Sequence, residues 1–130
     1  MRSDKEKTKI IAFDLDDVLC SRDSNEGALE KYLSCKPIQK MIDICNECYN
    51  SGYEIIIYTA RGMTSQSGDI SKIYHNLYEL TKEQLTEWGV HHHKLVMGKQ
   101  HYDLLIDDKA SFSGNIDSVA DIEQAITGGR

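Results

Sequence analysis

The stretch FDLDDVLC, residues 13–20, decides the fold of this chain. It continues a short apolar run, IIA, and the two together predict a buried β-strand over residues 9–14. At the end of that strand, Asp14, Asp16 and Asp17 place three carboxylates within four positions. Carboxylates in such a place repel one another and lose hydration, so the fold or a bound ligand has to compensate them.

The composition is that of a globular protein with one domain, because the chain has 130 residues, of which 40% are hydrophobic and 28% charged. The net charge of −6 argues against a nucleic-acid-binding face, which needs a basic surplus. No stretch approaches the length of a membrane span, and the charged start MRSDKEKTK does not resemble a signal peptide. We therefore expect a cytoplasmic protein with no membrane and no nucleic-acid partner.

The four cysteines are expected to be reduced thiols in such a compartment. Cys45 and Cys48 form a CxxC pair, which we interpret as two buried side chains on one helix rather than as a redox pair or half of a zinc site. The internal run His91–His93 is expected in a loop that enters a strand, with a metal site as the less favoured alternative.

Short apolar runs alternate with helical patterns along the chain. Strands are predicted over residues 9–14, 53–59 (YEIIIYT), 93–97 and 102–107 (YDLLID). Helices are predicted from Pro37 to Ser51, over residues 70–78, from an N-cap at Thr81 with Gln84 three positions on, and over residues 117–126. This alternation predicts an α/β fold with a doubly wound, mostly parallel sheet covered on both faces.

In such a sheet, chemistry lies at the carboxyl ends of the strands. The polar residues expected there are Asp14, Asp16, Thr59, Lys99, Asp107 and Asp108. Carboxylates in this number suit Mg²⁺, which binds carboxylate, water and phosphate oxygens. A carboxylate can also attack phosphorus, a second one can transfer a proton, and a lysine can neutralise charge in the transition state.

Four segments, FDLDDVLC, IIIYTAR, Lys99 and LLIDDKA, resemble in this order the four motifs of the haloacid dehalogenase (HAD) superfamily. The combination YTARGM … GKQHYDLLIDDKA is similar to the short phosphatases encoded with bacterial capsular polysaccharide synthesis genes. The resemblance implies a single HAD-like hydrolase domain over residues 1–130, with a Rossmann-like doubly wound core and no cap domain.

The resemblance also implies a role for each matching residue. Asp14 would be the nucleophile and a Mg²⁺ ligand, and Asp16 the general acid and base, with its backbone carbonyl reaching the metal. Thr59, with the adjoining Ala60 and Arg61, would bind the substrate, and Lys99 would hold the phosphoryl group and Asp14. The remaining metal ligands would be Asp107, which binds directly, and Asp108, which binds through water.

This chain departs from the family pattern at three positions: Asp17 stands where Gly is common, Val18 where Thr is common, and Gln100 where the capsule-type proteins often have Pro. Proteins of this kind without a cap act on large substrates or take a lid from a neighbouring subunit, so we expect an open site or a homo-oligomer. Arg61, Met63 and residues 21–36 would then contact the leaving group. For Arg61, a structural ion pair is an equal alternative.

The expected function is that of a Mg²⁺-dependent phosphomonoester hydrolase acting on a small phosphorylated sugar or polyol precursor of capsular or surface polysaccharide. A nucleotide or nucleic-acid-end phosphatase on the same fold is the alternative. A receiver-like module phosphorylated on aspartate is disfavoured, because its phosphorylated Asp would end the third strand, where this chain has Val96-Met97-Gly98. A binding protein without catalytic activity is a further, weaker alternative.

Overall fold

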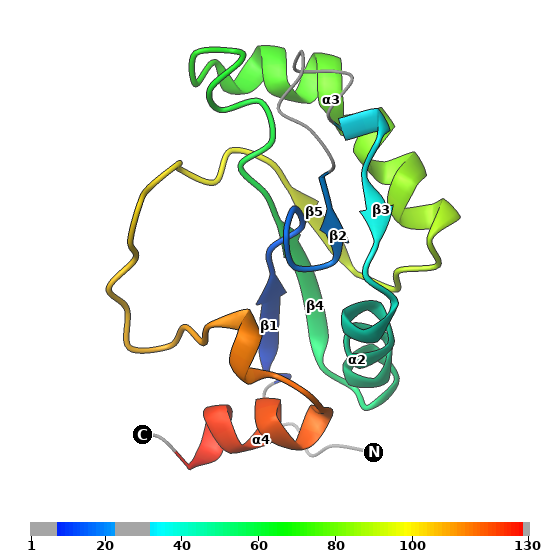
Figure 1. Ribbon diagram of the computed structural model, residues 1–130, viewed down its shortest axis with the longest axis vertical. Helices are drawn as coiled ribbons and strands as arrows, with labels where there is room; N and C mark the ends of the chain where they lie inside the picture. Colours follow the sequence, from blue (N-terminus) through cyan, green and yellow to red (C-terminus); the bar gives the residue numbers. More distant parts are fainter. Residues whose placement is uncertain (1–7, 23–31, 129–130) are drawn as a thin grey trace.

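The computed structural model describes residues 8–22 and 32–128, which form an α/β fold (Figure 1). Its centre is a parallel three-stranded sheet in the order β1-β4-β5. The strands are β1 (Ile10–Phe13), β4 (Glu54–Tyr58) and β5 (Lys94–Val96). They confirm three of the four predicted strands.

The register of the sheet separates a buried face from a more open one. Phe13 pairs with Ile57, which pairs with Leu95, and all three side chains are buried on the same face. On the opposite face, Ile10 is 59% exposed and Tyr58 38% exposed. Within the described chain, the sheet is therefore covered well on one face.

Three α-helices accompany the sheet in the described residues: α2 (Gln39–Asn50), α3 (Ile70–Glu87) and α4 (Val119–Thr127), with a short 3-10 helix η1 (Ser113–Asn115) before α4. Helix α2 packs against β4 and α4. Its buried residues, at helical spacing, are Met41, Ile42, Ile44, Cys45 and Cys48. The interpretation of Cys45 and Cys48 as two buried helical side chains is therefore confirmed.

A small antiparallel ribbon, which the sequence pattern did not predict, follows the aspartate turn. It pairs β2 (Cys20–Ser21) with β3 (Lys36–Pro37). The expectation that Pro37 lies in the first turn of a helix was wrong, because it pairs with Cys20 and helix α2 begins at Gln39. Proline is tolerated in such a short edge strand because it has no N–H to leave unpaired.

The predicted break between two helices near residue 80 was also wrong, because α3 is one continuous helix. Its N-cap is Asp69, whose side chain accepts a hydrogen bond from the N–H of Lys72 (3.2 Å). Thr81 and Gln84 lie inside the helix and are buried, with 0% and 8% exposure. A spacing of three residues is typical of a capping box, but inside a helix the same spacing places two polar side chains on one face.

The predicted fourth strand, residues 102–107, is not formed in the structure. After β5 the chain forms a long loop, yellow to orange in Figure 1, which lies apart from β1 and leads to η1. Leu104 is 76% exposed and Ile106 90% exposed. An apolar run becomes a strand only when a neighbouring strand accepts its backbone hydrogen bonds, and within the described chain β1 pairs with β4 alone.

Within the described residues, no helix is both long and apolar enough to cross a membrane.

Candidate active site

A tight turn at the carboxyl end of β1 presents the three aspartates. The carbonyl of Leu15 accepts hydrogen bonds from the N–H groups of Val18, Leu19 and Cys20, at 2.9–3.2 Å. Leu15 and Leu19 are fully buried and anchor the turn in the core. The three aspartates, which lie on either side of Leu15, are therefore held at the edge of the core.

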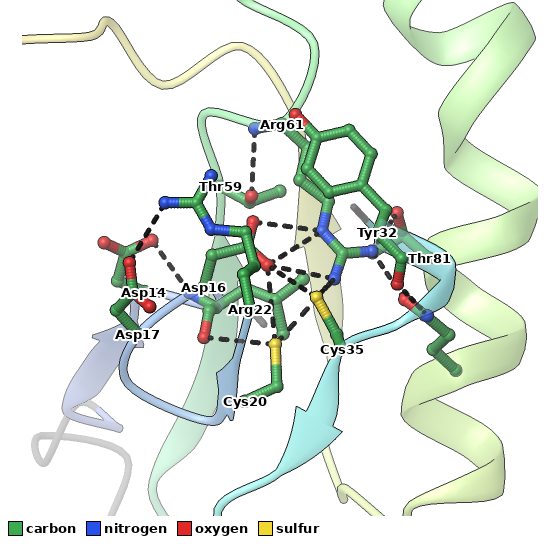
Figure 2. A network of polar contacts seen from close by, with 12 residues as sticks. Asp14, Asp16, Asp17, Cys20, Arg22, Tyr32, Cys35, Thr59, Arg61 and Thr81 are labelled. Carbon is green, nitrogen blue, oxygen red and sulfur yellow. Dashed lines mark hydrogen bonds and ion pairs between the residues drawn. The ribbon is translucent and has the colours of Figure 1, made fainter. Parts of the chain in front are cut away.

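Each of the three carboxylates is paired with a different cation. Asp14 lies 3.0 Å from Lys99 Nζ, Asp16 lies 3.0 Å from Arg61 Nη2, and Asp17 lies 3.0 Å from Arg22 Nη2. Figure 2 shows Asp16 and Asp17 facing separate guanidinium groups. Three ion pairs thus compensate the mutual repulsion of the carboxylates.

The pair between Asp14 and Lys99 is the more accessible of the two pairs that involve predicted catalytic residues. The Asp14 side chain is 37% exposed and that of Lys99 is 17% exposed. Burial lowers the pKa of the Lys99 ammonium, but the hydrogen bond and charge of Asp14 outweigh this effect and raise that pKa above its usual value. A partly exposed carboxylate therefore lies beside an ammonium group that stays protonated at neutral pH.

The end of β4 is tied to the same place by backbone hydrogen bonds. The N–H of Lys99 donates to the carbonyl of Thr59 (3.0 Å), which fixes the start of the loop after β5 against the end of β4. Thr59 is 1% exposed, and its hydroxyl oxygen accepts a hydrogen bond from the N–H of Arg61 (3.1 Å). This contact shapes the turn through Ala60, which is half-buried.

Arg61 is buried, and the structure shows the ion-pair alternative for its side chain. Its side chain is 0% exposed, and its Nε and Nη2 atoms reach both carboxylate oxygens of Asp16 at 3.0–3.3 Å. On the other side, Nη1 donates to Thr81 Oγ1 (3.2 Å) and Gln84 Oε1 (2.6 Å) on α3. The guanidinium of Arg61 is therefore held by Asp16 and by helix α3, which does not agree with the expected contact between Arg61 and the substrate.

Tyr32 covers the guanidinium group of Arg61. Its ring centroid lies 4.8 Å from the Arg61 guanidinium carbon, which is the geometry of a cation–π contact. The Tyr32 hydroxyl accepts a hydrogen bond from the N–H of Gly62 (3.0 Å), and its carbonyl accepts one from Gln84 Nε2 (2.6 Å). Tyr32 thus joins the loop after β4 to helix α3.

Two cysteines complete the surroundings of Asp16. The thiols of Cys20 and Cys35 lie 3.4 and 3.6 Å from Asp16 Oδ1, and 3.8 and 3.6 Å from Arg61 Nη2 (Figure 2). One donor atom from each of Asp16, Cys20 and Cys35 lies within 4.8 Å of the others, a spacing that could hold a metal ion. The guanidinium of Arg61 already lies against all three atoms, and burial raises the pKa of both thiols, which disfavours the thiolate that metals bind.

The residues predicted to bind Mg²⁺ are not brought together. Asp14 is held by Lys99, and the carboxylate of Asp16 is held by Arg61. Asp107 and Asp108 lie on the exposed loop, where Asp107 Oδ1 accepts a hydrogen bond from the N–H of Lys109 (2.9 Å). This arrangement does not fit the carboxylate set that the family resemblance implies for Mg²⁺, because the predicted fourth strand that would carry Asp107 and Asp108 is not formed.

Of the residues expected near a leaving group, Met63 is half-buried and packs against the core. Residues 23–31 of the stretch 21–36 lie outside the described residues. The sequence did not identify Cys20, Thr81 or Gln84 as parts of the site, and it included Tyr32 and Cys35 only as members of the stretch 21–36. Only the spacing of Thr81 and Gln84 gave a signal, and it was assigned to helix capping.

No protein-family model and no curated protein matches the chain. Among solved structures, the chain is similar to a crystal structure of a structural-genomics target from Vibrio cholerae, with a TM-score of 0.81 and 26% identity. The alignment covers 95% of this chain and 100% of that one, so the two proteins share an α/β fold over nearly their whole length. The description of that protein names no activity.

Proposed function

We propose that this protein is a Mg²⁺-dependent phosphomonoester hydrolase that works through an aspartyl-phosphate, on a small phosphorylated sugar or polyol precursor of capsular or surface polysaccharide. The observation that carries the proposal is the pairing of Asp14 with Lys99 at 3.0 Å. It combines a partly exposed carboxylate, which can attack phosphorus, with an ammonium group, which can neutralise phosphoryl oxygens. The HAD-like order of the sequence motifs supports the same assignment.

The proposed reaction has two displacements at phosphorus. In the first, an oxygen of Asp14 forms a bond to phosphorus, the bond to the leaving oxygen breaks, and Asp16 gives a proton to that oxygen. In the second, Asp16 takes a proton from water, the water oxygen bonds to phosphorus, and the bond between phosphorus and Asp14 breaks. Lys99 remains protonated beside the phosphoryl group and opposes the negative charge that develops there.

The proposed Mg²⁺ dependence requires a further strand beside β1, which the described residues do not form. A doubly wound HAD core would place residues 102–107 along the edge of β1 that β4 does not occupy. Two observations support this arrangement: within the described chain β1 pairs with β4 alone, and Leu104 and Ile106 are apolar side chains exposed to solvent. Parallel pairing would bring Asp107 and Asp108 to the carboxyl end of β1, where Asp14 lies.

A nucleotide phosphatase is retained as the second candidate because aromatic rings lie beside the proposed nucleophile. The Lys99 ammonium lies 5.3 Å from the ring centroid of Tyr102 and 6.0 Å from that of Tyr58. Tyr102 is 40% exposed and Tyr58 is 38% exposed. Such rings can pack against the apolar face of a sugar or stack on a nucleobase, so they do not choose between the two leaving groups.

We propose a cytoplasmic location and an open site that a second copy of the chain covers as a lid. The proposal of a lid rests on the interval between Arg61 and Lys99, where a cap could be inserted but which is occupied by α3 and β5 of the core. Light scattering of the purified protein tests this part of the proposal, since a monomer at the concentrations used for activity would contradict it.

The function is tested by phosphate release from a panel of sugar, polyol and nucleotide monophosphates, with Mg²⁺ and with EDTA. We expect metal-dependent turnover that Asp14→Asn abolishes, with a sugar or polyol phosphate as the best substrate. Asp17→Asn is the matched control, because it alters the same turn at an exposed carboxylate without a proposed catalytic role. Turnover that survives Asp14→Asn would contradict the proposal, and a preference for nucleotides would favour the second candidate.

A further inference from the structure

We propose that Arg61 is a positioning residue that holds the Asp16 carboxylate in its working orientation, and that helix α3 holds Arg61 in turn. The inference rests on the proposed function, because it concerns how the proposed acid and base is held. It replaces the expected contact between Arg61 and the leaving group with an indirect role.

Arg61 donates hydrogen bonds to the Asp16 carboxylate from two of its nitrogen atoms. Nε lies 3.3 and 3.1 Å from the two carboxylate oxygens, and Nη2 lies 3.0 Å from one of them. Two donors of a planar guanidinium fix both the distance and the plane of a carboxylate. The thiols of Cys20 and Cys35 approach the same oxygen at 3.4 and 3.6 Å, which restricts the carboxylate further.

The guanidinium is itself immobilised from behind. Nη1 donates to Thr81 Oγ1 and Gln84 Oε1, which share one face of α3, and the Tyr32 ring lies against the guanidinium plane at 4.8 Å. Each of the three nitrogen atoms therefore has a protein partner, and the side chain is 0% exposed. Helix α3 therefore holds Arg61, and Arg61 orients Asp16, although no residue of α3 takes part in the proposed chemistry.

A buried ion pair of this kind is weak evidence for a purely stabilising role. A buried ion pair stabilises a protein weakly, because desolvation of both charges offsets their attraction, and an apolar residue of similar size often does as well. The Asp16 side chain keeps 13% exposure, so one end of the pair reaches the surface of the site while the other is enclosed. This geometry fixes the carboxylate while leaving part of it open to a bound molecule.

The test compares three variants with the same substrate. Arg61→Lys keeps the charge but cannot grip the carboxylate at two points, and a displacement of this kind lowers kcat on the order of 100-fold. Thr81→Val removes one acceptor of Arg61 and is expected to lower kcat between about twofold and tenfold, which corresponds to one hydrogen bond. Thr86→Val is the matched control on the exposed side of the same helix, where kcat should stay within about twofold.

The split between kcat and KM separates positioning from substrate contact. Positioning predicts that KM changes by less than about threefold in Arg61→Lys and Thr81→Val while kcat falls. Free guanidinium ion should restore part of the lost kcat in Arg61→Ala. A raised KM with unchanged kcat in Arg61→Lys, or equal losses in Thr81→Val and Thr86→Val, would overturn the inference.

A spectroscopic measurement keeps this inference distinct from the proposed function. In protein labelled with ¹³C at the aspartate carboxyl carbons, Asp16 should give one sharp resonance, identified by its loss in Asp16→Asn. We expect that resonance to broaden or divide in Arg61→Lys and Thr81→Val, and to stay unchanged in Thr86→Val. An unchanged Asp16 resonance in the first two variants contradicts positioning, whereas a wild-type protein without phosphatase activity contradicts only the proposed function.

Discussion

Asp17 occupies a backbone conformation that most residues avoid, with a φ of 68°. Glycine reaches this left-handed region at the lowest cost because it has no Cβ, and asparagine and aspartate follow because their short polar side chains can hydrogen-bond to the nearby backbone. The turn needs this conformation so that the N–H of Asp17 can reach the carbonyl of Cys20 (2.6 Å).

Substitutions at Asp17 test this interpretation. We expect Asp17→Gly to stay within about 1 kcal/mol of the wild type, because relief of strain offsets the loss of an exposed ion pair with Arg22. Asp17→Val should be less stable by about 1–2 kcal/mol, since a β-branched residue does not tolerate a positive φ. Urea unfolding measures both variants, and equal midpoints for Gly and Val would show that the conformation carries no strain.

At the same scale, the sequence predicted some contacts of the candidate site and missed others. The contact between Asp14 and Lys99 was predictable because both residues belong to motifs that a parallel sheet brings to one edge. The partners of Arg61 on α3 were not, because Thr81 and Gln84 belong to no motif that links them to the site. A buried arginine is recognised only when the three-dimensional contacts are known.

At the scale of elements, the loop after β4 and helix α3 pack so closely at Gly62 that a side chain there would displace its neighbours. A Cβ atom there would lie 2.6 Å from Leu77 Cδ1 and 3.1 Å from Ile73 Cγ1, and the residue has a φ of 81°. Gly62 also donates its N–H to the hydroxyl of Tyr32, so this close approach helps to place the Tyr32 ring against Arg61.

Gly62→Ala should therefore destabilise the protein by about 1–3 kcal/mol, through overpacking added to backbone strain. Gly52→Ala is the control, because Gly52 also has a positive φ, 99°, but nothing lies within 4 Å of its Cβ position. The difference between the two unfolding free energies isolates the clash with α3. Equal losses of unfolding free energy in the two variants would mean that the side chains of helix α3 accommodate the added methyl group without destabilising the protein.

Helix α2 carries two thiols whose titration should influence stability at alkaline pH. Burial raises the pKa of Cys45 to about 12 and that of Cys48 to about 11, from the usual value of 9.0. The folded state therefore keeps these protons above pH 9 where the unfolded state loses them, so the stabilising contribution is full below pH 9 and falls as the pH rises toward 11–12.

The measurement is the slope of the unfolding free energy against pH between 9 and 11, compared with Cys45→Ala/Cys48→Ala, which lacks both groups. The variant should show a shallower decline than the wild type in this window, although it is less stable at neutral pH. Identical slopes would show that the two thiols titrate alike in the folded and unfolded states.

At the scale of the whole molecule, the sequence predicted the α/β class and most of the element order. The prediction succeeded where an element is specified by its own pattern, as in β4, α2 and α4. It failed where the partner decides. Residues 102–107 have a strand composition but no neighbouring strand among the described residues, and Lys36–Pro37 form a strand only because Cys20–Ser21 lie opposite.

The proposed docking of residues 102–107 on β1 predicts a change in amide hydrogen exchange. Exposed loop amides exchange rapidly, whereas amides in a strand ladder are protected. We expect protection at Leu104 to Ile106 to increase when Mg²⁺ is added, and the effect to disappear in Asp107→Asn/Asp108→Asn. Uniformly fast exchange with and without Mg²⁺, in protein that is active as a metal-dependent phosphatase, would contradict the docking.

The central claim is that Asp14 forms a covalent bond to the phosphoryl group of the substrate. The most direct measurement is mass spectrometry of protein quenched in acid during turnover, followed by peptide mapping across the aspartate turn. We predict one phosphoryl group on Asp14, none on Asp16 or Asp17, and none on any residue in Asp14→Asn. Turnover by a protein in which the phosphoryl group is carried elsewhere, or in which no phosphorylated protein forms in single-turnover conditions, would contradict the account.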